Sequence, residues 1–262
     1  LDYQQGAPVG FLWVHKAMID WVSFSEWGLR LPTLIAGLLI PCLIWDAARR
    51  LANPMAGALA VLMVIFHREI GLYVPEVKQY AFDCATTAGL LWAWSLLPEG
   101  RLSFRIWVGL GLMGLVLPWL SHAALFGLAG FGLALLWRTV AAKGDKGEVA
   151  KVMGIGALWF FGVAALYVLQ LHTLAEEEWA KVWWAKHFAP LPFSNGWSLW
   201  WGRRIVSQFL FGTNWGIYLF PLYLTGLWVF WRRNPATVVL LVVPMIVTWI
   251  ASSFEAYPFY GR

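Results

Sequence analysis

Charged residues are scarce in this sequence. Asp, Glu, Lys and Arg make up 13% of its 262 residues, whereas a soluble domain carries about a quarter. Hydrophobic residues account for 60%, and the mean hydropathy is +0.64. This balance excludes an ordinary soluble domain and indicates a polytopic membrane protein. In such a protein the net charge of +5 mainly sets the orientation of the chain, so it gives no reason to expect a nucleic-acid partner.

Cysteine is also nearly missing. Cys42 and Cys84 are the two cysteines, and both fall in or beside apolar runs. Two cysteines exclude a disulfide framework and are too few for a structural zinc site, so we interpret both as packing residues. Isolated histidines show no metal-ligand spacing and are also interpreted as structural; they are His15, His122, His172 and His187.

Long apolar runs predict an all-α fold, a transmembrane helix bundle forming one domain over 1–262. We expect about eight membrane segments, at 31–48, 54–70, 80–97, 106–120, 122–137, 152–171, 215–231 and 236–253. Several approach the roughly 20 residues that a full span needs, and others are short. The run 106–137 would be about 48 Å long as one helix, longer than a ~30 Å hydrocarbon core. We therefore expect it to divide near Pro118, because proline disfavours a continuous helix.

Basic residues predict the orientation. Short loops carry most of them, and cytoplasmic loops are enriched in Lys and Arg. We therefore expect the cytoplasmic side to hold Arg49, Arg50, Arg101, Arg105, Arg138, Lys143, Lys146, Lys151, Arg232 and Arg233. The longer loops 1–30, 67–79, 172–214 and 254–262 would then face outward and include interfacial helices. The chain begins at Leu1 without a leading apolar segment and ends in a predicted loop, so we expect a piece of a longer protein.

The stretch "HREIGLYVPEVKQYAFD" places six ionisable residues between two hydrophobic runs. A charge at mid-membrane costs roughly 2.5–3.5 kcal/mol, so this stretch indicates the mouth of a polar site or, alternatively, an ordinary charged connector. A helix begun by Pro75 would place Glu76, Tyr80, Asp83 and Thr87 on one face. Lys78 would point elsewhere, toward a neighbour or a substrate.

Each of three other basic residues allows two interpretations of its role. Lys16 lies in a predicted interfacial helix, "GAPVGFLWVHKAMIDW", where it either anchors the surface or faces inward to bind an anion. Arg203 and Arg204 either bind phosphate or extend to lipid headgroups.

The order of several motifs resembles a known family. The motifs are "DYQQGAPVGFLWVHKAM", "SEWGLRLPTLIAGLLIPCLIWDAARRL" and "YVPEVKQYAFD", followed by "WWAKHFAPLPFSNGWSLWW" and "YPFYGR". Together they resemble the GT-C class of integral-membrane glycosyltransferases, in the bacterial branch related to protein O-mannosyltransferases and the lipid A aminoarabinose transferase. The resemblance covers most of the chain, and "SEWGLRLP" and "EVKQYAFD" are its most specific parts.

The resemblance implies a function. Such enzymes transfer a sugar from a polyprenyl-phosphate donor to a lipid, glycan or protein acceptor, on the outer (periplasmic) face of the bacterial inner membrane. It implies a catalytic role for Asp83 and Glu76. It implies substrate binding by Lys16, Lys78 and Arg262, to which we add Tyr80 from the predicted helical face and Arg203 and Arg204. The resemblance assigns no definite cofactor, and a divalent metal is left open.

Two features depart from the family pattern. The principal acid of the family belongs to an Asp-Glu pair in the first outer loop, which we expect upstream of Asp2, so residues 1–262 alone should be inactive. "HREI" also replaces the small polar residues expected before the second outer loop. The alternative function is a non-enzymatic transporter of lipid-linked or polar solutes. A transporter favours polar groups at mid-span and repeat symmetry, whereas the charges of this sequence gather on one predicted face.

Overall fold

The computed structural model describes residues 6–142, 146–172, 182, 184–191, 193–202 and 216–258. All regular structure in these residues is helical, which confirms the predicted fold class. The elements are α1 (Val9–Trp21), α2 (Glu26–Leu51), α3 (Pro54–Ile65), α4 (Arg68–Tyr73), α5 (Tyr80–Ser95), α6 (Phe104–Leu120), α7 (Ala124–Ala141), α8 (Lys146–Leu166), the π-helical turn η1 (Tyr167–Leu171), the 3-10 turn η2 (Ala185–His187), α11 (Trp197–Trp200), α12 (Gly216–Arg233) and α13 (Pro235–Ser253).

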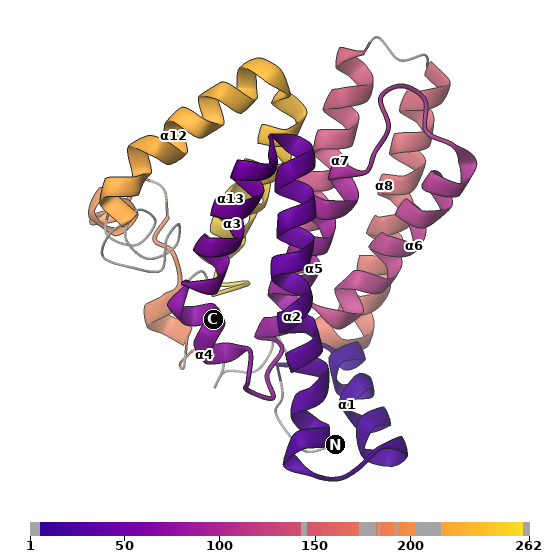
Figure 1. Ribbon diagram of the computed structural model, residues 1–262, viewed down its shortest axis with the longest axis vertical. Helices are drawn as coiled ribbons and strands as arrows, with labels where there is room; N and C mark the ends of the chain where they lie inside the picture. The colour runs from indigo at the N-terminus through magenta and orange to yellow at the C-terminus, as the bar shows by residue number, and fades with distance from the viewer. Residues whose placement is uncertain are drawn as a thin grey trace.

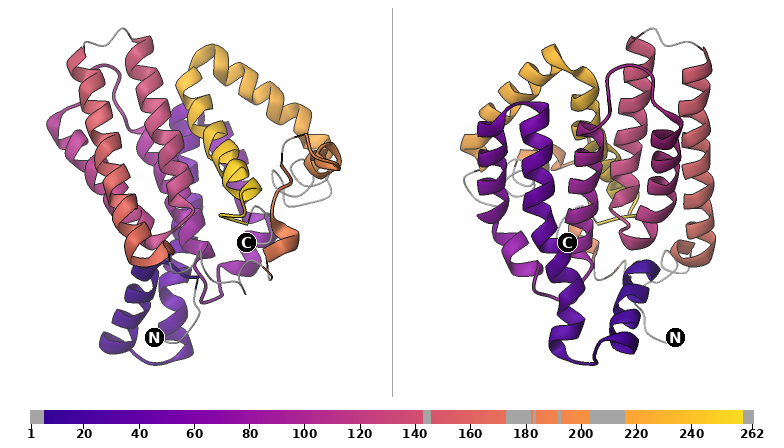
Figure 2. Two further views of the ribbon diagram at one scale, coloured as in Figure 1. Left: turned by 180° about the vertical axis from the view of Figure 1, so that it is seen from behind. Right: turned by 45° about the vertical axis from the view of Figure 1, so that its right-hand side comes forward.

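The long helices form a bundle around α5 and α7 (Figure 1). α5 packs against α2 and α7, and α13 covers another side of α7. α3 packs beside α2, whereas α6 and α8 pack against each other. α12 leans away from the bundle and contacts it mainly through α13, with Trp231 also packing beside Trp137 of α7 (Figures 1 and 2).

Local sequence explains where several helices begin. Asn53 and Asn234 each precede a proline, and each asparagine side chain accepts a hydrogen bond from a backbone N–H of the first turn, at 2.9 Å from Ala56 and 3.2 Å from Thr237. Asparagine is among the strongest N-caps, and proline suits the first helical position because its missing N–H has no helical partner there. The same two-residue signal therefore starts α3 and α13.

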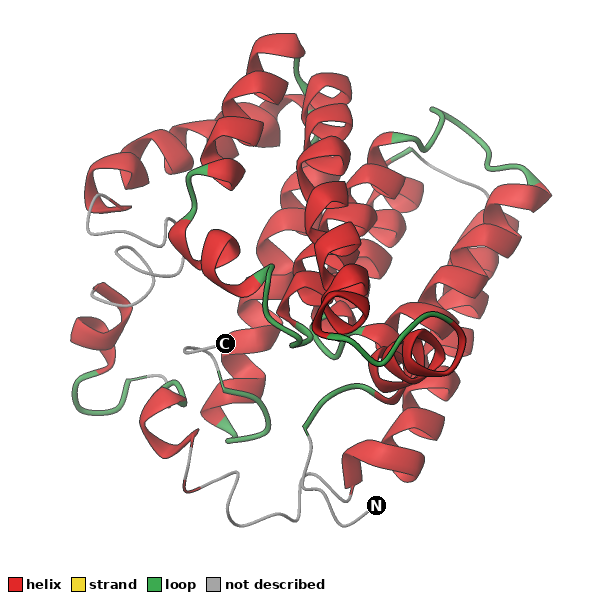
Figure 3. Cartoon of the chain, turned by 60° about the horizontal axis from the view of Figure 1, so that its bottom comes forward, coloured by secondary structure: helices red, strands yellow, loops and turns green. Residues whose placement is uncertain are grey.

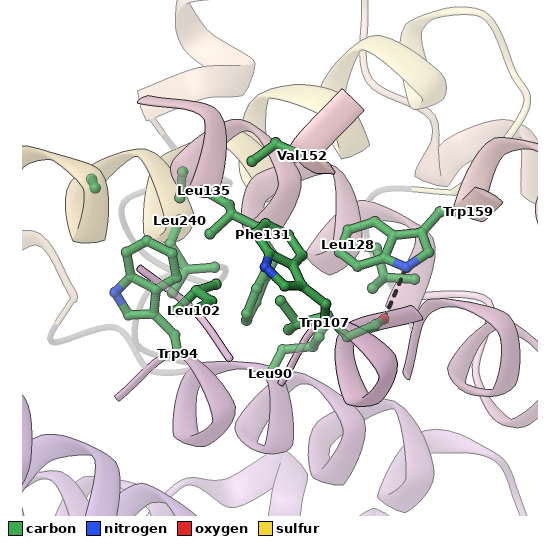
Figure 4. Packing of buried hydrophobic residues seen from close by; sticks show 13 residues of the cluster. Leu90, Trp94, Leu102, Trp107, Leu128, Phe131, Leu135, Val152, Trp159 and Leu240 are labelled. Atoms are coloured by element: carbon green, nitrogen blue, oxygen red, sulfur yellow. Dashed lines mark hydrogen bonds between the residues drawn. The ribbon is translucent and has the colours of Figure 1, made fainter. Parts of the chain in front are cut away.

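Aromatic side chains fill the centre of the bundle (Figure 4). Trp94, Phe131 and Trp159 are all buried, and their rings meet edge to face or nearly so. Both indole N–H groups are satisfied. Trp94 donates to the Thr237 hydroxyl at 2.9 Å, and Trp159 donates to the Leu110 carbonyl at 3.0 Å. The core thus links α5, α6, α7, α8 and α13 while leaving no polar atom of these two indoles unpaired.

Each predicted apolar segment coincides with a helix, with one change. The predicted segment 54–70 is divided, because α3 ends at Ile65 and α4 begins at Arg68. The predicted division near Pro118 is found, since α6 ends at Leu120 and α7 begins at Ala124. The number of membrane spans is not confirmed. Among the described residues, the helices long and apolar enough to cross a membrane are four: Glu26–Leu51, Ala124–Ala141, Lys146–Leu171 and Pro235–Ser253.

The two ends of the bundle differ in character. At one end α2 and α7 finish, α8 begins and α12 turns into α13 (Figures 1 and 2). We call this the basic end, because its helix termini carry Arg49, Arg50, Arg138, Lys146, Arg232 and Arg233. At the opposite end α5 begins, α6 turns into α7 and η1 follows α8. We call this the α1 end, because α1 packs across it. Figure 3 brings it forward and shows loops gathered between the helix ends.

α1 and the first turns of α2 form a helical hairpin that extends beyond the other helices (Figure 2). Its turn is stabilised by Ser25, whose hydroxyl accepts a 3.1 Å hydrogen bond from the N–H of Gly28 at the start of α2. The first half of α1 is buried against the bundle through Pro8, Gly10 and Phe11, and its last residue, Trp21, is exposed. α1 therefore covers the α1 end with its N-terminal half.

Candidate functional site at the α1 end

Asp83 lies in the first turn of α5, at the α1 end, and is half-buried. The hydroxyl of Ser121, a fully buried residue in the turn between α6 and α7, donates a 2.5 Å hydrogen bond to its Oδ1. The same hydroxyl accepts a 3.2 Å hydrogen bond from the Ala124 N–H. A carboxylate in the first turn of a helix is also favoured by the helix dipole. These contacts fix the position and orientation of the Asp83 side chain.

The predicted helical face of Glu76, Tyr80 and Asp83 is not formed. α5 begins at Tyr80, and Glu76 lies in the turn before it, where Lys78 N–H donates to the Glu76 carbonyl at 2.8 Å. This turn allows Glu76 Oε2 and Lys78 Nζ to form an ion pair at 2.8 Å. Residues i and i+2 do not face each other on a helix, so the pair requires the turn. The predicted shared face was wrong because it extended α5 too far toward its N-terminus, whereas the catalytic role expected for Glu76 stays a prediction.

Lys78 also contacts two tyrosines. Its ammonium nitrogen lies 6.0 Å from the ring centre of Tyr73, at the end of α4, and 5.9 Å from that of Tyr80. The two rings meet edge to face at 4.8 Å. The hydrogen bond to Glu76 raises the pKa of Lys78 above its ordinary value. Lys78 was expected to point away from the neighbouring acids, and the structure instead pairs it with one of them while leaving its side chain about half exposed.

α1 contacts Phe82, which precedes Asp83 in α5, and the end of α6. Phe11 packs edge to face on Phe82 at 5.3 Å, and His15 lies against the same two rings. Gly10 approaches the end of α6 so closely that a Cβ there would lie 2.5 Å from the carbonyl oxygen of Trp119. The N-terminal half of α1 thus packs against Phe82, next to Asp83, and against Trp119, two positions before Ser121.

The remaining predicted binding residues have different outcomes. Lys16 does not face inward: its side chain is 71% exposed and pairs with Asp20 at 2.8 Å. Arg203, Arg204 and Arg262 lie outside the described residues. Within the described ranges, no three His, Cys, Asp or Glu side chains come together as a metal site would require.

Three residues that form hydrogen bonds between separate elements at the α1 end were not predicted from the sequence. No role was predicted from the sequence for Ser121, Gln79 or Gln170. A signal was present for Gln170, because it interrupts an otherwise apolar run, "YVLQL", and polar residues within membrane segments are costly. Ser121 had a weaker signal, since its partner is 38 positions away.

These observations define an integral membrane protein with a polar site at one end of a helical bundle. A comparison with protein families matches residues 6–167 to the family described as dolichyl-phosphate-mannose-protein mannosyltransferase, and the chain belongs to this family. No curated protein and no solved structure matches it. Family membership confirms the resemblance inferred from the sequence motifs and indicates a membrane glycosyltransferase. Asp83, Lys78 and Ser121 all fall within the matched residues.

Proposed function

We propose that this protein transfers a sugar from a polyprenyl-phosphate donor to an acceptor at the α1 end, and that this end faces outward. The observation that carries the proposal is the Asp83 carboxylate held by Ser121 at the end of the bundle opposite the basic end. The family supports the reaction class. The basic residues support the orientation, because cytoplasmic loops carry an excess of Lys and Arg.

The chemistry assigned to Asp83 is general-base assistance, beside the principal acid that we expect upstream of Asp2. An acceptor hydroxyl oxygen bonds to the anomeric carbon of the sugar while the bond from that carbon to the phosphate oxygen breaks. The hydroxyl proton passes to a carboxylate, and polyprenyl phosphate leaves. General-base help is typically worth 10²–10⁴-fold in rate. The Ser121 hydrogen bond orients the Asp83 carboxylate, which matters because proton transfer depends on position.

Lys78 is the proposed contact for the leaving phosphate. Its ammonium is held by Glu76 and the rings of Tyr73 and Tyr80, and its side chain still reaches solvent. An ammonium beside the phosphate favours the negative charge that develops there. In this arrangement Glu76 positions Lys78 and does not itself take the proton.

Reconstitution with defined donors tests the proposal. The full-length protein in lipid vesicles is supplied with a polyprenyl-phosphate sugar or with the corresponding nucleotide sugar, and transfer to added acceptors is measured by mass spectrometry. We expect the product from the polyprenyl donor alone. Use of the nucleotide sugar would overturn the donor assignment, and movement of the lipid-linked sugar across the vesicle without transfer would indicate the transporter alternative.

A further inference from the structure

Two glutamine side chains bind the short segment that leads into α1. The amide nitrogen of Gln170 donates to the Ala7 carbonyl at 2.8 Å, and its amide oxygen accepts from the Val9 N–H at 3.2 Å. From the other side, the amide nitrogen of Gln79 lies 3.5 Å from the carbonyl oxygen of Gly6 and donates to it. We call this set of contacts the glutamine clamp. It joins three parts of the chain that are far apart in sequence.

Gln170 suits this role chemically. The first N–H groups of a helix have no partner within the helix, and Val9 is the first residue of α1. Ala7 and Pro8, between the bound groups, are buried, so an unpaired carbonyl or N–H there would be costly. A side-chain amide supplies one donor and one acceptor at once, which no apolar residue and no charged residue can do.

The position of Gln170 is also unusual. It lies in η1, the π-helical turn that follows α8. π-helical turns are rare and occur often at functional sites. The residue therefore combines a polar side chain in an apolar run with a π-helical turn, and its hydrogen bonds to Ala7 and Val9 account for the polar side chain.

The clamp is connected to the candidate site through Gln79. This residue precedes α5, and its carbonyl accepts a 2.9 Å hydrogen bond from the Asp83 N–H. Its side chain binds Gly6 while its backbone holds the first turn that carries Asp83. Beyond the clamp, α1 continues directly into the contacts of Phe11 with Phe82 and of Gly10 with Trp119.

We propose that Gln170 is a positioning residue for the transfer reaction. With Gln79 it holds the segment Gly6–Val9, and it thereby keeps α1 packed against Phe82 and Trp119, which lie next to the Asp83–Ser121 pair in the sequence. Gln170 does not touch the reacting atoms. This inference rests on the proposed function, because it assigns a purpose to the geometry around Asp83.

Graded substitutions at Gln170 test the clamp in the full-length protein. Gln170→Ala removes both hydrogen bonds. Gln170→Glu retains an oxygen for the Val9 N–H and loses the donor to Ala7. Misplacement of about 1 Å at a reacting centre costs up to 10²-fold, so we expect kcat to fall about tenfold for Ala and less for Glu, with the donor KM within about twofold of the original protein. Leu169→Ala is the matched control, since Leu169 is the exposed neighbour in the same turn, and its kcat should be unchanged.

Hydrogen exchange supplies a readout that does not depend on activity. Gln170→Ala should speed exchange of the amides at the start of α1 while leaving those of α5 and α7 as slow as before. Gln79→Ala provides a second variant if Gln170→Ala does not fold. Because both glutamines act through one segment, their effects on kcat should not multiply in the double variant. Unchanged exchange at α1, or fully multiplicative effects on kcat, would overturn the clamp.

The failure of the clamp can be told apart from the failure of the proposed function. Asp83→Asn serves as the reference. Loss of turnover in Asp83→Asn with full turnover in Gln170→Ala would refute the positioning role of Gln170 and leave the proposed function supported. Full turnover in both variants would remove the proposed role of Asp83, and with it the purpose assigned to Gln170.

Discussion

The hydroxyl of Ser121 lies 2.5 Å from Oδ1 of Asp83 across 38 positions of sequence. This hydrogen bond ties the first turn of α5 to the turn between α6 and α7. Because Ser121 is fully buried, its hydroxyl has little access to water, and the carboxylate is the partner that satisfies its donor. The pair therefore contributes to packing and, in the proposed reaction, to chemistry, and substitutions can separate the two contributions.

Asp83→Asn keeps the shape of the side chain and an oxygen for the Ser121 hydroxyl, but removes the charge and the ability to take a proton. We expect turnover to fall by about tenfold or more while the melting temperature changes little. Ser121→Ala should lower turnover less, because the carboxylate stays but loses its orienting contact. Ser95→Ala is the control, since Ser95 lies at the far end of α5 and donates to its own helix. Normal turnover in Asp83→Asn would exclude it as the base.

Lys78→Ala should weaken binding of the polyprenyl-phosphate donor, because it removes a charge-assisted contact to phosphate. The competing view is that Lys78 and Glu76 only stabilise each other. A half-exposed ion pair contributes about 0.2–1 kcal/mol, so we expect the melting temperature of Lys78→Ala to stay close to that of the original protein. Donor affinity and melting temperature are measured for Lys78→Ala, for Glu76→Gln and for the double variant, and together they decide between the two views. A loss of stability that the double variant restores, with donor affinity unchanged, would make the pair structural.

The raised pKa of Lys78 predicts the pH dependence of donor binding. The ordinary value is 10.5, and the hydrogen bond to Glu76 moves the folded value higher. The ammonium and its attraction to Glu76 are therefore fully present below 10.5 and are lost as the pH rises through the folded pKa. Donor affinity should show no Lys78 titration at neutral pH and should fall in the alkaline range. Glu76→Gln should move that fall to lower pH, which titration of donor binding can measure.

Thiol labelling tests the orientation. Cysteine is placed at Lys146, at the basic end, or at Ser194, and both positions are exposed. In intact cells we expect an impermeant thiol reagent to label Ser194→Cys and not Lys146→Cys. Cys42 is exposed, so the background must carry alanine at Cys42 and Cys84. Labelling of Lys146→Cys from outside would reverse the proposed orientation.

Gly130→Ala should destabilise the bundle. A Cβ at this position would lie 2.7 Å from the ring of Pro244 and 2.9 Å from the carbonyl oxygen of Leu240, so α7 and α13 would have to separate. Overpacking of this kind typically costs 1–3 kcal/mol. Gly154→Ala is the control, because nothing lies within 4 Å of its Cβ position and alanine is the better helix former. Thermal unfolding in detergent should show a lower melting temperature for Gly130→Ala alone.

The helices could be predicted because their signals are local. Apolar runs bounded by Asn-Pro or by basic residues mark where α3 and α13 begin and where α2 and α12 end. The start of α5 could not be predicted in this way. Pro75 is a plausible first helical residue, but the Glu76–Lys78 ion pair and the contact of Lys78 with two tyrosines stabilise a turn instead.

The site itself was only partly accessible to sequence reasoning. Asp83 and Lys78 were singled out from the sequence because charged residues in an apolar chain are costly, and their roles stay predictions. Ser121 and Gln170 were missed because their roles depend on partners that only the folded chain brings near, 38 and more than 160 positions away. From sequence alone, a serine or glutamine is indistinguishable from an ordinary turn or surface residue until its partner is known.

The length of α2 has a mechanical consequence. Its 26 residues correspond to about 39 Å at 1.5 Å per residue, roughly 9 Å more than the hydrocarbon thickness of a bilayer. The surplus corresponds to the first turns of α2, which extend beyond the other helices and connect to α1 (Figure 2). Each residue added to or removed from these first turns would rotate α1 by about 100° around the axis of α2 and move it by about 1.5 Å along that axis. Insertions in the first turns of α2 would therefore rotate α1 relative to Phe82 and Trp119, whereas insertions in the exposed turn before α2 would be absorbed.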